Sequence, residues 1–217
     1  MIVYLNGKYL DADQAMISVW DGGFLYGDGI YTTLRLYRGR PLDLRAHLLR
    51  LRKHAAELDL PLPLTNEDLD AVARELARRN GLSDKDGRLR ITVSRGGAAD
   101  APLPVAGLDA IAPTILATLT PIGPELERWQ ADGIGVITLG ESQARGNFPA
   151  LKTLNSLAAV RALRAAAAAG SSPRGLGRRS GEGASPRPAT GWKRGGTDPG
   201  GHAFAWLRGA PSRSPGA

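Results

Sequence analysis

The sequence predicts an α/β protein of α+β type, with two domains followed by a tail that forms no core. Two observations support this fold class. Through residue 170 the apolar residues alternate between the period of strands and the spacing of helices, and the composition changes abruptly after Gly170. We place an N-terminal α/β domain at residues 1–120, a second domain at 125–170 and the tail at 171–217.

The chain is expected to open with a β-hairpin. Ile2 to Leu5 and Lys8 to Leu10 flank Asn6-Gly7, and a two-residue turn of this kind needs positive φ at both positions. Ile30 to Tyr37 then alternates apolar residues with polar and aromatic ones, which predicts a strand with two distinct faces.

Two helices are expected next. Apolar positions from Leu44 to Leu58 recur at helical spacing, and a proline follows them. The second helix starts after Thr65, an N-cap residue with Asp68 three positions on, and ends near Gly81.

The later elements alternate in the same way. They are strands at Leu89–Ser94, Ile111–Leu119 and Ile134–Leu139, a linker at Pro121–Pro124, a loop at Gly140–Pro149, and a helix at Lys152–Ala169. The second of these strands is predicted despite Pro113. Because the last helix starts beside Lys152, its N-terminal dipole favours the uncharged form of the lysine amine.

The tail has a different chemistry from the rest of the chain. Of its 47 residues, 30 are Gly, Pro, Arg or Ser, too few apolar residues to offset roughly 1–2 kcal/mol of backbone entropy per residue. We therefore expect residues 171–217 to be disordered. Because GC-rich codons read out of frame give such a mixture, we hypothesise a frameshifted or truncated C-terminus.

The net charge of +7 is located in this tail. Residues 1–170 hold 20 Lys and Arg against 19 Asp and Glu, whereas residues 171–217 hold 8 against 2. One alternative is therefore a non-catalytic chain whose basic tail binds polyanions. Nucleic acid is not favoured as a partner, because the tail lacks regularly interleaved aromatic residues.

The sequence also favours a cytoplasmic protein. It contains no cysteine, which excludes disulfides and thiolate metal sites. Its start has no basic leader, and no apolar run approaches the roughly 20 residues of a membrane span. We expect no membrane partner.

Most catalytic motifs are missing from the sequence. It has no G-x-x-x-x-G-K, G-x-G-x-x-G, H-E-x-x-H or G-x-S-x-G pattern, and His47 and His54 have no evident third ligand, so no metal is expected. Lysine and arginine chemistry remains. Lys152 follows the apolar run Phe148-Pro149-Ala150-Leu151, which suits a desolvated catalytic amine, although a solvated surface lysine is the plainer alternative.

Three segments together resemble the class IV pyridoxal-phosphate-dependent aminotransferases, a family that includes branched-chain and D-amino-acid aminotransferases and aminodeoxychorismate lyases. The segments are Asp21-Gly22-Gly23-Phe24-Leu25-Tyr26-Gly27-Asp28-Gly29-Ile30-Tyr31, His47-Leu48-Leu49-Arg50-Leu51 and Leu151-Lys152-Thr153-Leu154-Asn155. The resemblance covers residues 1 to about 170. It implies that pyridoxal 5'-phosphate (PLP) is the cofactor and that the protein is a homodimer.

The resemblance also implies roles for individual residues. Lys152, in K-x-L-N context, carries the cofactor, and Arg50 contacts the cofactor phosphate. Tyr31 and Thr33 lie beside the substrate. Arg95 could hold a substrate carboxylate, and a plain surface arginine is the alternative at that position.

The resemblance leaves the substrate open. Thr32-Thr33 is closer to aminodeoxychorismate lyases, whereas Leu151-Lys152-Thr153-Leu154-Asn155 is closer to transaminases. We expect amino transfer between a branched-chain or D-amino acid and a 2-oxo acid, with the lyase reaction as the alternative. The family's later strands and the glutamate that pairs with the pyridine nitrogen are missing, and Glu182 is a poor match for that glutamate. We therefore expect a truncated second domain, whose activity depends on whether the site still forms.

Overall fold

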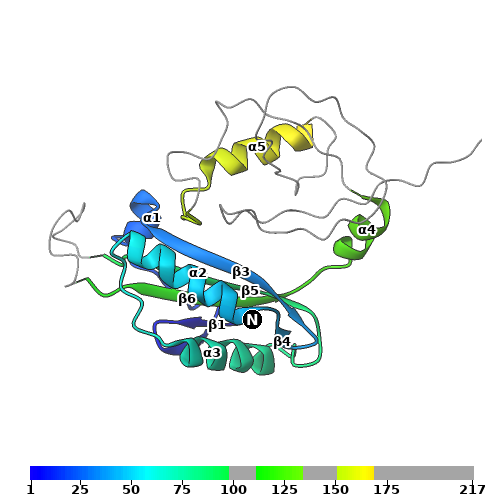
Figure 1. The fold of residues 1–217 in the computed structure, drawn as a ribbon, viewed down its shortest axis with the longest axis horizontal. Coiled ribbons are helices and arrows are strands. Elements are labelled where there is room, and N and C mark those ends of the chain that lie inside the picture. Colours follow the sequence, from blue (N-terminus) through cyan, green and yellow to red (C-terminus); the bar gives the residue numbers. More distant parts are fainter. Residues whose placement is uncertain (98–110, 134–150, 169–217) are drawn as a thin grey trace, which may run out of the picture. The chain divides into compact units, whose positions relative to one another are not determined.

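The computed structural model describes residues 1–97, 111–133 and 151–168 (Figure 1). These residues divide between two compact units. The first comprises Met1–Ile122 together with Leu151–Asn155. The second contains two described helices, α4 (Glu125–Asp132) and α5 (Leu157–Ala168). The domain division at residues 1–120 and 125–170 stays a prediction.

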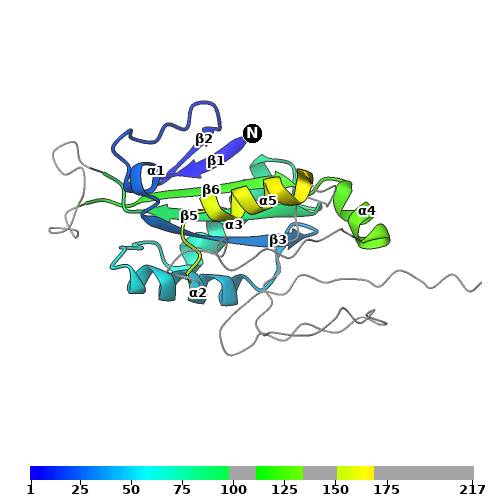
Figure 2. The same cartoon turned by 90° about the horizontal axis from the view of Figure 1, so that it is seen from above.

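The first unit is a six-stranded antiparallel sheet with helices. The strands are β1 (Ile2–Leu5), β2 (Lys8–Asp11), β3 (Gly29–Tyr37), β4 (Arg40–Pro41), β5 (Gly87–Ser94) and β6 (Thr114–Pro121). The helices are α1 (Gly22–Tyr26), α2 (Leu44–Glu57) and α3 (Asn66–Arg79). The strand order is β2-β1-β6-β5-β3-β4, and Figure 2 shows the central strands side by side.

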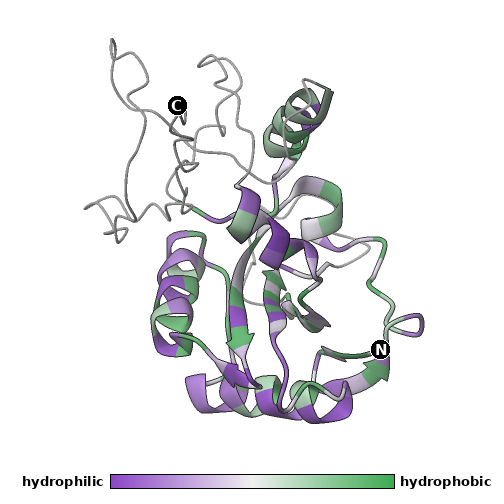
Figure 3. Ribbon diagram, turned by 90° about the vertical axis from the view of Figure 1, so that its right-hand side faces the viewer, coloured by the Kyte–Doolittle hydropathy of each residue, from purple (hydrophilic) through white to green (hydrophobic). Residues whose placement is uncertain are grey.

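The core lies between one face of the sheet and the helices α2 and α3. Ile30, Leu34 and Leu36 of β3 are buried on the same face, as the alternation in the sequence predicts. Leu51 of α2 and Leu76 of α3 are among the helical residues that join the same cluster. Figure 3 shows hydrophilic and hydrophobic stretches alternating along the helices, as expected of amphipathic helices. The predicted mixed fold is confirmed.

The local turn and capping predictions are also confirmed. Asn6 and Gly7 have φ values of 47° and 87°, and Leu5 pairs with Lys8 across the hairpin. The Thr65 side chain accepts a hydrogen bond from the Asp68 backbone N–H. The Asp68 carboxylate accepts one from the Thr65 N–H in return, which completes the capping box of α3.

Three predicted boundaries are corrected. Strand β6 begins at Thr114, after Pro113, whose nitrogen has no hydrogen to donate to a ladder. The predicted linker is shorter than expected, because β6 continues through Pro121 and α4 begins at Glu125. The last helix begins at Leu157, five residues after Lys152, so the lysine does not lie in the first turn as predicted.

Helices α1 and α4 and the short strand β4 were not predicted. Asp21 caps α1 by accepting hydrogen bonds from the N–H groups of Gly23 and Phe24, and Gly27 ends this helix at φ 71°. The predicted strand at Ile134–Leu139, the loop at Gly140–Pro149 and the tail lie outside the described residues. Within the described ranges no helix is long and apolar enough to cross a membrane.

Leu76→Ala is expected to destabilise the first unit strongly. The Leu76 side chain is fully buried, so the substitution leaves a cavity that costs about 2–5 kcal/mol in the free energy of unfolding. Leu49→Ala, the same substitution at an exposed helical position, is the matched control and should stay within about 0.5 kcal/mol. Urea unfolding measures both, and equal effects would contradict the placement of the core.

Candidate active site

The segment that contains Lys152 lies along the free edge of β3. Ile30 and Thr153 form an antiparallel bridge. The Tyr31 N–H donates to the Lys152 carbonyl at 2.9 Å, and the Leu154 N–H donates to the Gly29 carbonyl, also at 2.9 Å. Lys152 therefore stands opposite Tyr31, and opposed residues of an antiparallel pair point to the same face.

The turn before β3 leaves room for this segment because it is built from glycines. A Cβ at Gly29 would lie 2.6 Å from the Val93 carbonyl oxygen and 2.7 Å from Leu154 Cδ1. Gly27 has a φ of 71°, which side chains rarely adopt. Gly29 is thus required by the close approach of both β5 and Leu154, and Gly27 by its left-handed backbone.

Lys152, Tyr31 and Arg90 form one cluster on that face. Lys152 Nζ lies 5.2 Å from the centroid of the Tyr31 ring, and Arg90 Cζ lies 3.8 Å from it, so the ring contacts two cations. Arg90 Nε also donates to Thr92 Oγ1 at 3.1 Å. Burial lowers the pKa of the Arg90 guanidinium, which remains charged at neutral pH. Thr33 pairs with Arg90 across β3 and β5.

Arg50 lies on α2 and contacts His47 and Thr32. Its Nη2 is 3.1 Å from His47 Nδ1 and 3.4 Å from Thr32 Oγ1, and that hydroxyl is 2.9 Å from His47 Nδ1. Guanidinium nitrogens only donate, so His47 Nδ1 accepts and the imidazole is neutral with its proton on Nε2. Among the described residues, Arg50 has no carboxylate partner within ion-pair distance.

The pKa values of the two helix histidines fit this assignment. Burial lowers the pKa of His47, and the charges of Arg50 and Lys152 lower it further, against a smaller opposing effect of Asp43. Burial also lowers the pKa of His54, whose Nδ1 lies 3.5 Å from the backbone nitrogen of Lys152. Lys152 is therefore close enough to both imidazoles for its charge to lower the pKa of each.

The structure does not bring Arg95 into this group. Its buried guanidinium donates to both carboxylate oxygens of Asp28 and to the carbonyls of Leu58 and Asp59. All three of its nitrogens are used within the fold. Arg95 thereby joins the turn before β3 to the C-terminal end of α2, and this geometry favours a structural role over substrate binding.

The sequence interpretation missed several residues of the site. His47 and His54 were weighed as metal ligands and set aside, yet their spacing with Arg50 places all three on one side of α2. That shared side is the signal that could have identified them. Arg90 could have been found from the alternation of residues 87–94, which puts it on the face away from the core.

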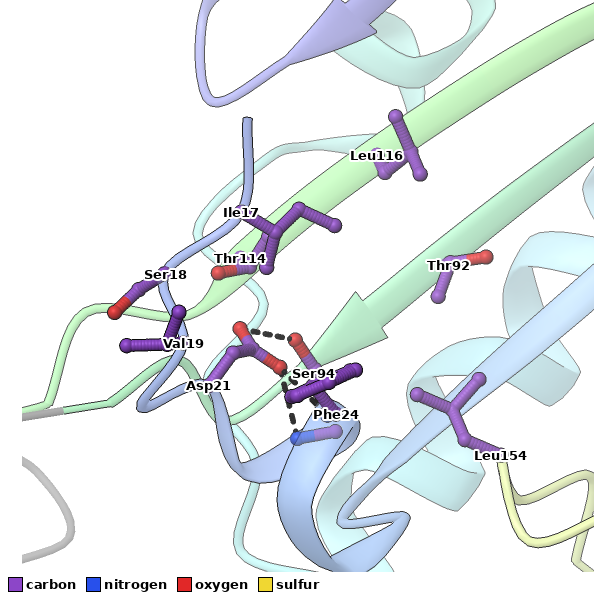
Figure 4. A pocket seen from close by; sticks show the side chains of 11 residues that line it. Ile17, Ser18, Val19, Asp21, Phe24, Thr92, Ser94, Thr114, Leu116 and Leu154 are labelled. Carbon is purple, nitrogen blue, oxygen red and sulfur yellow. Dashed lines mark hydrogen bonds between the residues drawn. The ribbon is translucent and has the colours of Figure 1, made fainter. Parts of the chain in front are cut away.

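A separate hollow of about 410 Å³ lies on the same sheet beside α1 (Figure 4). Ile17, Leu116 and Leu154 give it apolar walls, while Asp21 and Ser94 are joined there by a 2.9 Å hydrogen bond. Neither Lys152 nor Arg50 lines this hollow. Its chemistry is apolar, and the cations of the candidate site lie outside it.

The family of the chain follows from comparison with known proteins. A family model described as amino-transferase class IV matches residues 29–172, more than half of the sequence. The chain therefore belongs to the class IV aminotransferases, and the predicted resemblance is confirmed. The matched range contains Tyr31, Arg50, Arg90 and Lys152.

The individual relatives are named for different activities. A Methanocaldococcus jannaschii protein, provisionally named a branched-chain-amino-acid aminotransferase, is 38% identical over 74% of this chain and 54% of its own length. Aminodeoxychorismate lyase of Bacillus subtilis is 30% identical over 68% of this chain and 49% of its own. This chain thus spans about half the length of these curated relatives.

A solved structure matches at the level of the fold and sequence. A hypothetical aminotransferase from Mycobacterium tuberculosis in its PLP-bound form aligns with a TM-score of 0.65 and 26% identity. The alignment covers 79% of this chain and 60% of the other. The sheet and helices described above are therefore those of an aminotransferase of this class.

Lys152→Met is expected to raise the pKa of His47 toward its ordinary value. The Lys152 charge lowers that pKa, so removing it makes protonation of the imidazole easier. NMR titration of the histidine signals without cofactor measures the effect. Lys53→Met is the matched control, because Lys53 acts on His54 and is not among the charges that shift His47. An unchanged His47 pKa in Lys152→Met would contradict the placement of the lysine.

Proposed function

We propose that the chain binds PLP through Lys152 and Arg50 and transfers an amino group between an amino acid and a 2-oxo acid. The observation that carries the proposal is the register of the Lys152 segment on β3, which sets the lysine beside Tyr31 and within electrostatic reach of His47. Family membership supports the same reaction class. The class of reaction is that of the family, and the activity of this chain is our proposal.

The donor set fits a phosphate group. Arg50 uses Nη2 for His47 and Thr32, and within the described part of the chain no acceptor is recorded for its Nε or Nη1. A guanidinium with free donors and no carboxylate partner suits a phosphate dianion. Glu182, the poor match for the glutamate that pairs with the pyridine nitrogen, lies outside the described residues.

The residues then divide the chemistry between them. When bound, PLP supplies an electron sink for the bond changes at the substrate α-carbon. Lys152 would hold the cofactor covalently in the resting protein, and its amine, once displaced by the amine of the substrate, would carry the proton removed from the α-carbon. Arg50 binds the phosphate, and His47 and Thr32 orient the guanidinium. Tyr31 and Thr33 are proposed to contact the substrate.

The substrate is proposed to be a branched-chain or D-amino acid, in keeping with the name of the M. jannaschii relative and with that of a further relative, D-alanine aminotransferase of Bacillus licheniformis. Aminodeoxychorismate cleavage is the second candidate, because Thr32 follows Tyr31 and a relative at 30% identity is named for that lyase. Pyruvate release from aminodeoxychorismate without an amino acceptor distinguishes the lyase from the transferase. The polyanion alternative concerns residues 171–217 and stays a prediction, as does the cytoplasmic location.

We also propose that the protein is a homodimer. Val19 and Phe24, which both line the hollow beside α1, are 67% and 74% exposed, and exposed apolar side chains gathered in one place favour a protein contact. A second copy is the partner that the family resemblance suggests. Sedimentation that stays monomeric across the micromolar range would contradict this part of the proposal.

Incubation with PLP is expected to give a visible absorption band that borohydride removes, leaving the cofactor on the peptide that contains Lys152. Lys152→Ala should abolish this covalent product, because no other amine occupies that position. Lys53→Ala, an exposed lysine on α2, is the control and should leave it unchanged. Absorbance and peptide mass spectrometry measure the outcome, and labelling that is equal in the two variants would refute the proposal.

Arg50→Met is expected to weaken PLP binding by roughly 10- to 100-fold. The substitution removes charge-assisted hydrogen bonds worth about 1.5–3 kcal/mol, while the methionine keeps the apolar part of the side chain. Fluorescence titration with PLP measures the affinity. Arg45→Met, at an exposed position of the same helix, is the control. Equal affinities in the two variants would argue against a phosphate role for Arg50.

A further inference from the structure

We infer that His54 is a positioning residue for Lys152: its imidazole holds the backbone of the lysine segment on α2. The Lys152 N–H donates to His54 Nδ1 at 3.5 Å, a long hydrogen bond. His54 is 7% exposed, so its side chain is buried in the fold. The importance of this contact for catalysis rests on the proposed function, but the contact itself does not.

The segment is a short piece of chain held on the first unit. Leu151–Asn155 is the piece of chain after Ile122 that belongs to this unit, and the residues on both sides of it belong to the other. Two hydrogen bonds tie the segment to β3, and Leu151 is buried beside them. The His54 contact adds a tie to α2, the helix that carries Arg50. It therefore couples the position of the lysine to that of the arginine.

This contact requires a neutral imidazole. Nδ1 accepts from an N–H only when it carries no proton, so the proton of the neutral ring is on Nε2. The surroundings favour that state: burial lowers the pKa of His54, and the charges of Arg50, Lys53 and Lys152 lower it further, although Glu57 opposes them. When the ring is protonated, Nδ1 becomes a donor that faces another donor.

The direction of the pH dependence follows from this shift. The ordinary pKa of a histidine, near 6.5, applies to the unfolded chain, and the fold lowers it; because the Lys152 charge contributes to that lowering, the pKa of His54 is lower with the segment attached than with it detached. The contribution of the contact is complete above about pH 6.5 and is lost as the pH falls through the lower value. Acid should therefore loosen the Lys152 segment before it unfolds the sheet.

Amide hydrogen exchange of the full chain without PLP tests the inference. The Tyr31 and Leu154 amides report attachment, because their acceptors are the Lys152 and Gly29 carbonyls. We expect their protection factors, corrected for intrinsic exchange, to fall roughly two- to tenfold between pH 7.5 and 5.5. Ile91, in the middle of β5, is the internal control and should not change over this range.

Two variants distinguish a hydrogen-bonding role of His54 from a role in which its side chain only fills space. His54→Gln offers an acceptor that does not titrate, so Tyr31 and Leu154 should remain protected at both pH values. His54→Phe fills the space without an acceptor and should lower protection at both. If His54→Phe does not fold, the wild-type pH series and His54→Gln still decide the matter. Protection that is independent of pH in the wild type, or that falls with pH equally in His54→Gln, would overturn the inference.

The outcome is distinguishable from failure of the proposed function. If the exchange behaves as expected but PLP never bonds to Lys152, the positioning role stands and the proposed cofactor role falls. If PLP bonds to Lys152 and exchange does not depend on His54, the cofactor role stands and the positioning role falls.

Discussion

The candidate site depends on the free edge of β3. Strand β5 occupies one side of β3, whereas β4 pairs with the far end alone, at Leu36 and Tyr37. The backbone groups of Gly29 and Tyr31 on the open side need partners, because an unpaired buried amide or carbonyl is costly. The Lys152 segment supplies them. Since a strand register fixes which side chains meet, these backbone bonds also determine that the lysine faces Tyr31.

Arg95 connects the C-terminal end of α2 to the turn before this edge. Its guanidinium joins Asp28, in the turn before β3, to two carbonyls at the C-terminal end of α2. Strand β3 carries Tyr31 and helix α2 carries Arg50, so one buried arginine, together with the apolar core, links the elements that hold the site. A charged side chain in this place is stable because all of its nitrogens have acceptors. Arg95 therefore contributes to the site indirectly, through the elements that it joins.

Local signals in the sequence were sufficient for the hairpin, for β3 and for the capped helix α3, because each depends on neighbouring residues such as Asn6-Gly7 or Thr65 and Asp68. The local signals gave the wrong secondary structure at Lys152. The helical spacing of the alanine-rich run suggested that the helix began there, but the segment pairs with a strand more than 100 residues earlier in the chain. No local pattern encodes that pairing. Arg95 could not be interpreted for the same reason, since its partners come from two distant elements.

The distribution of charge separates Arg50 and Arg90 from the paired arginines of the sheet and helices. Arg35, Arg74, Arg78 and Arg95 each meet a carboxylate. Arg50 and Arg90, both half-buried near Tyr31 or His47, meet none among the described residues. Partly buried cations are costly unless an anion or hydrogen-bond acceptor compensates them. A fold that pairs its buried Arg95 with Asp28, yet holds Arg50 and Arg90 with no carboxylate among the described residues, supports the proposal that this face receives an anionic ligand.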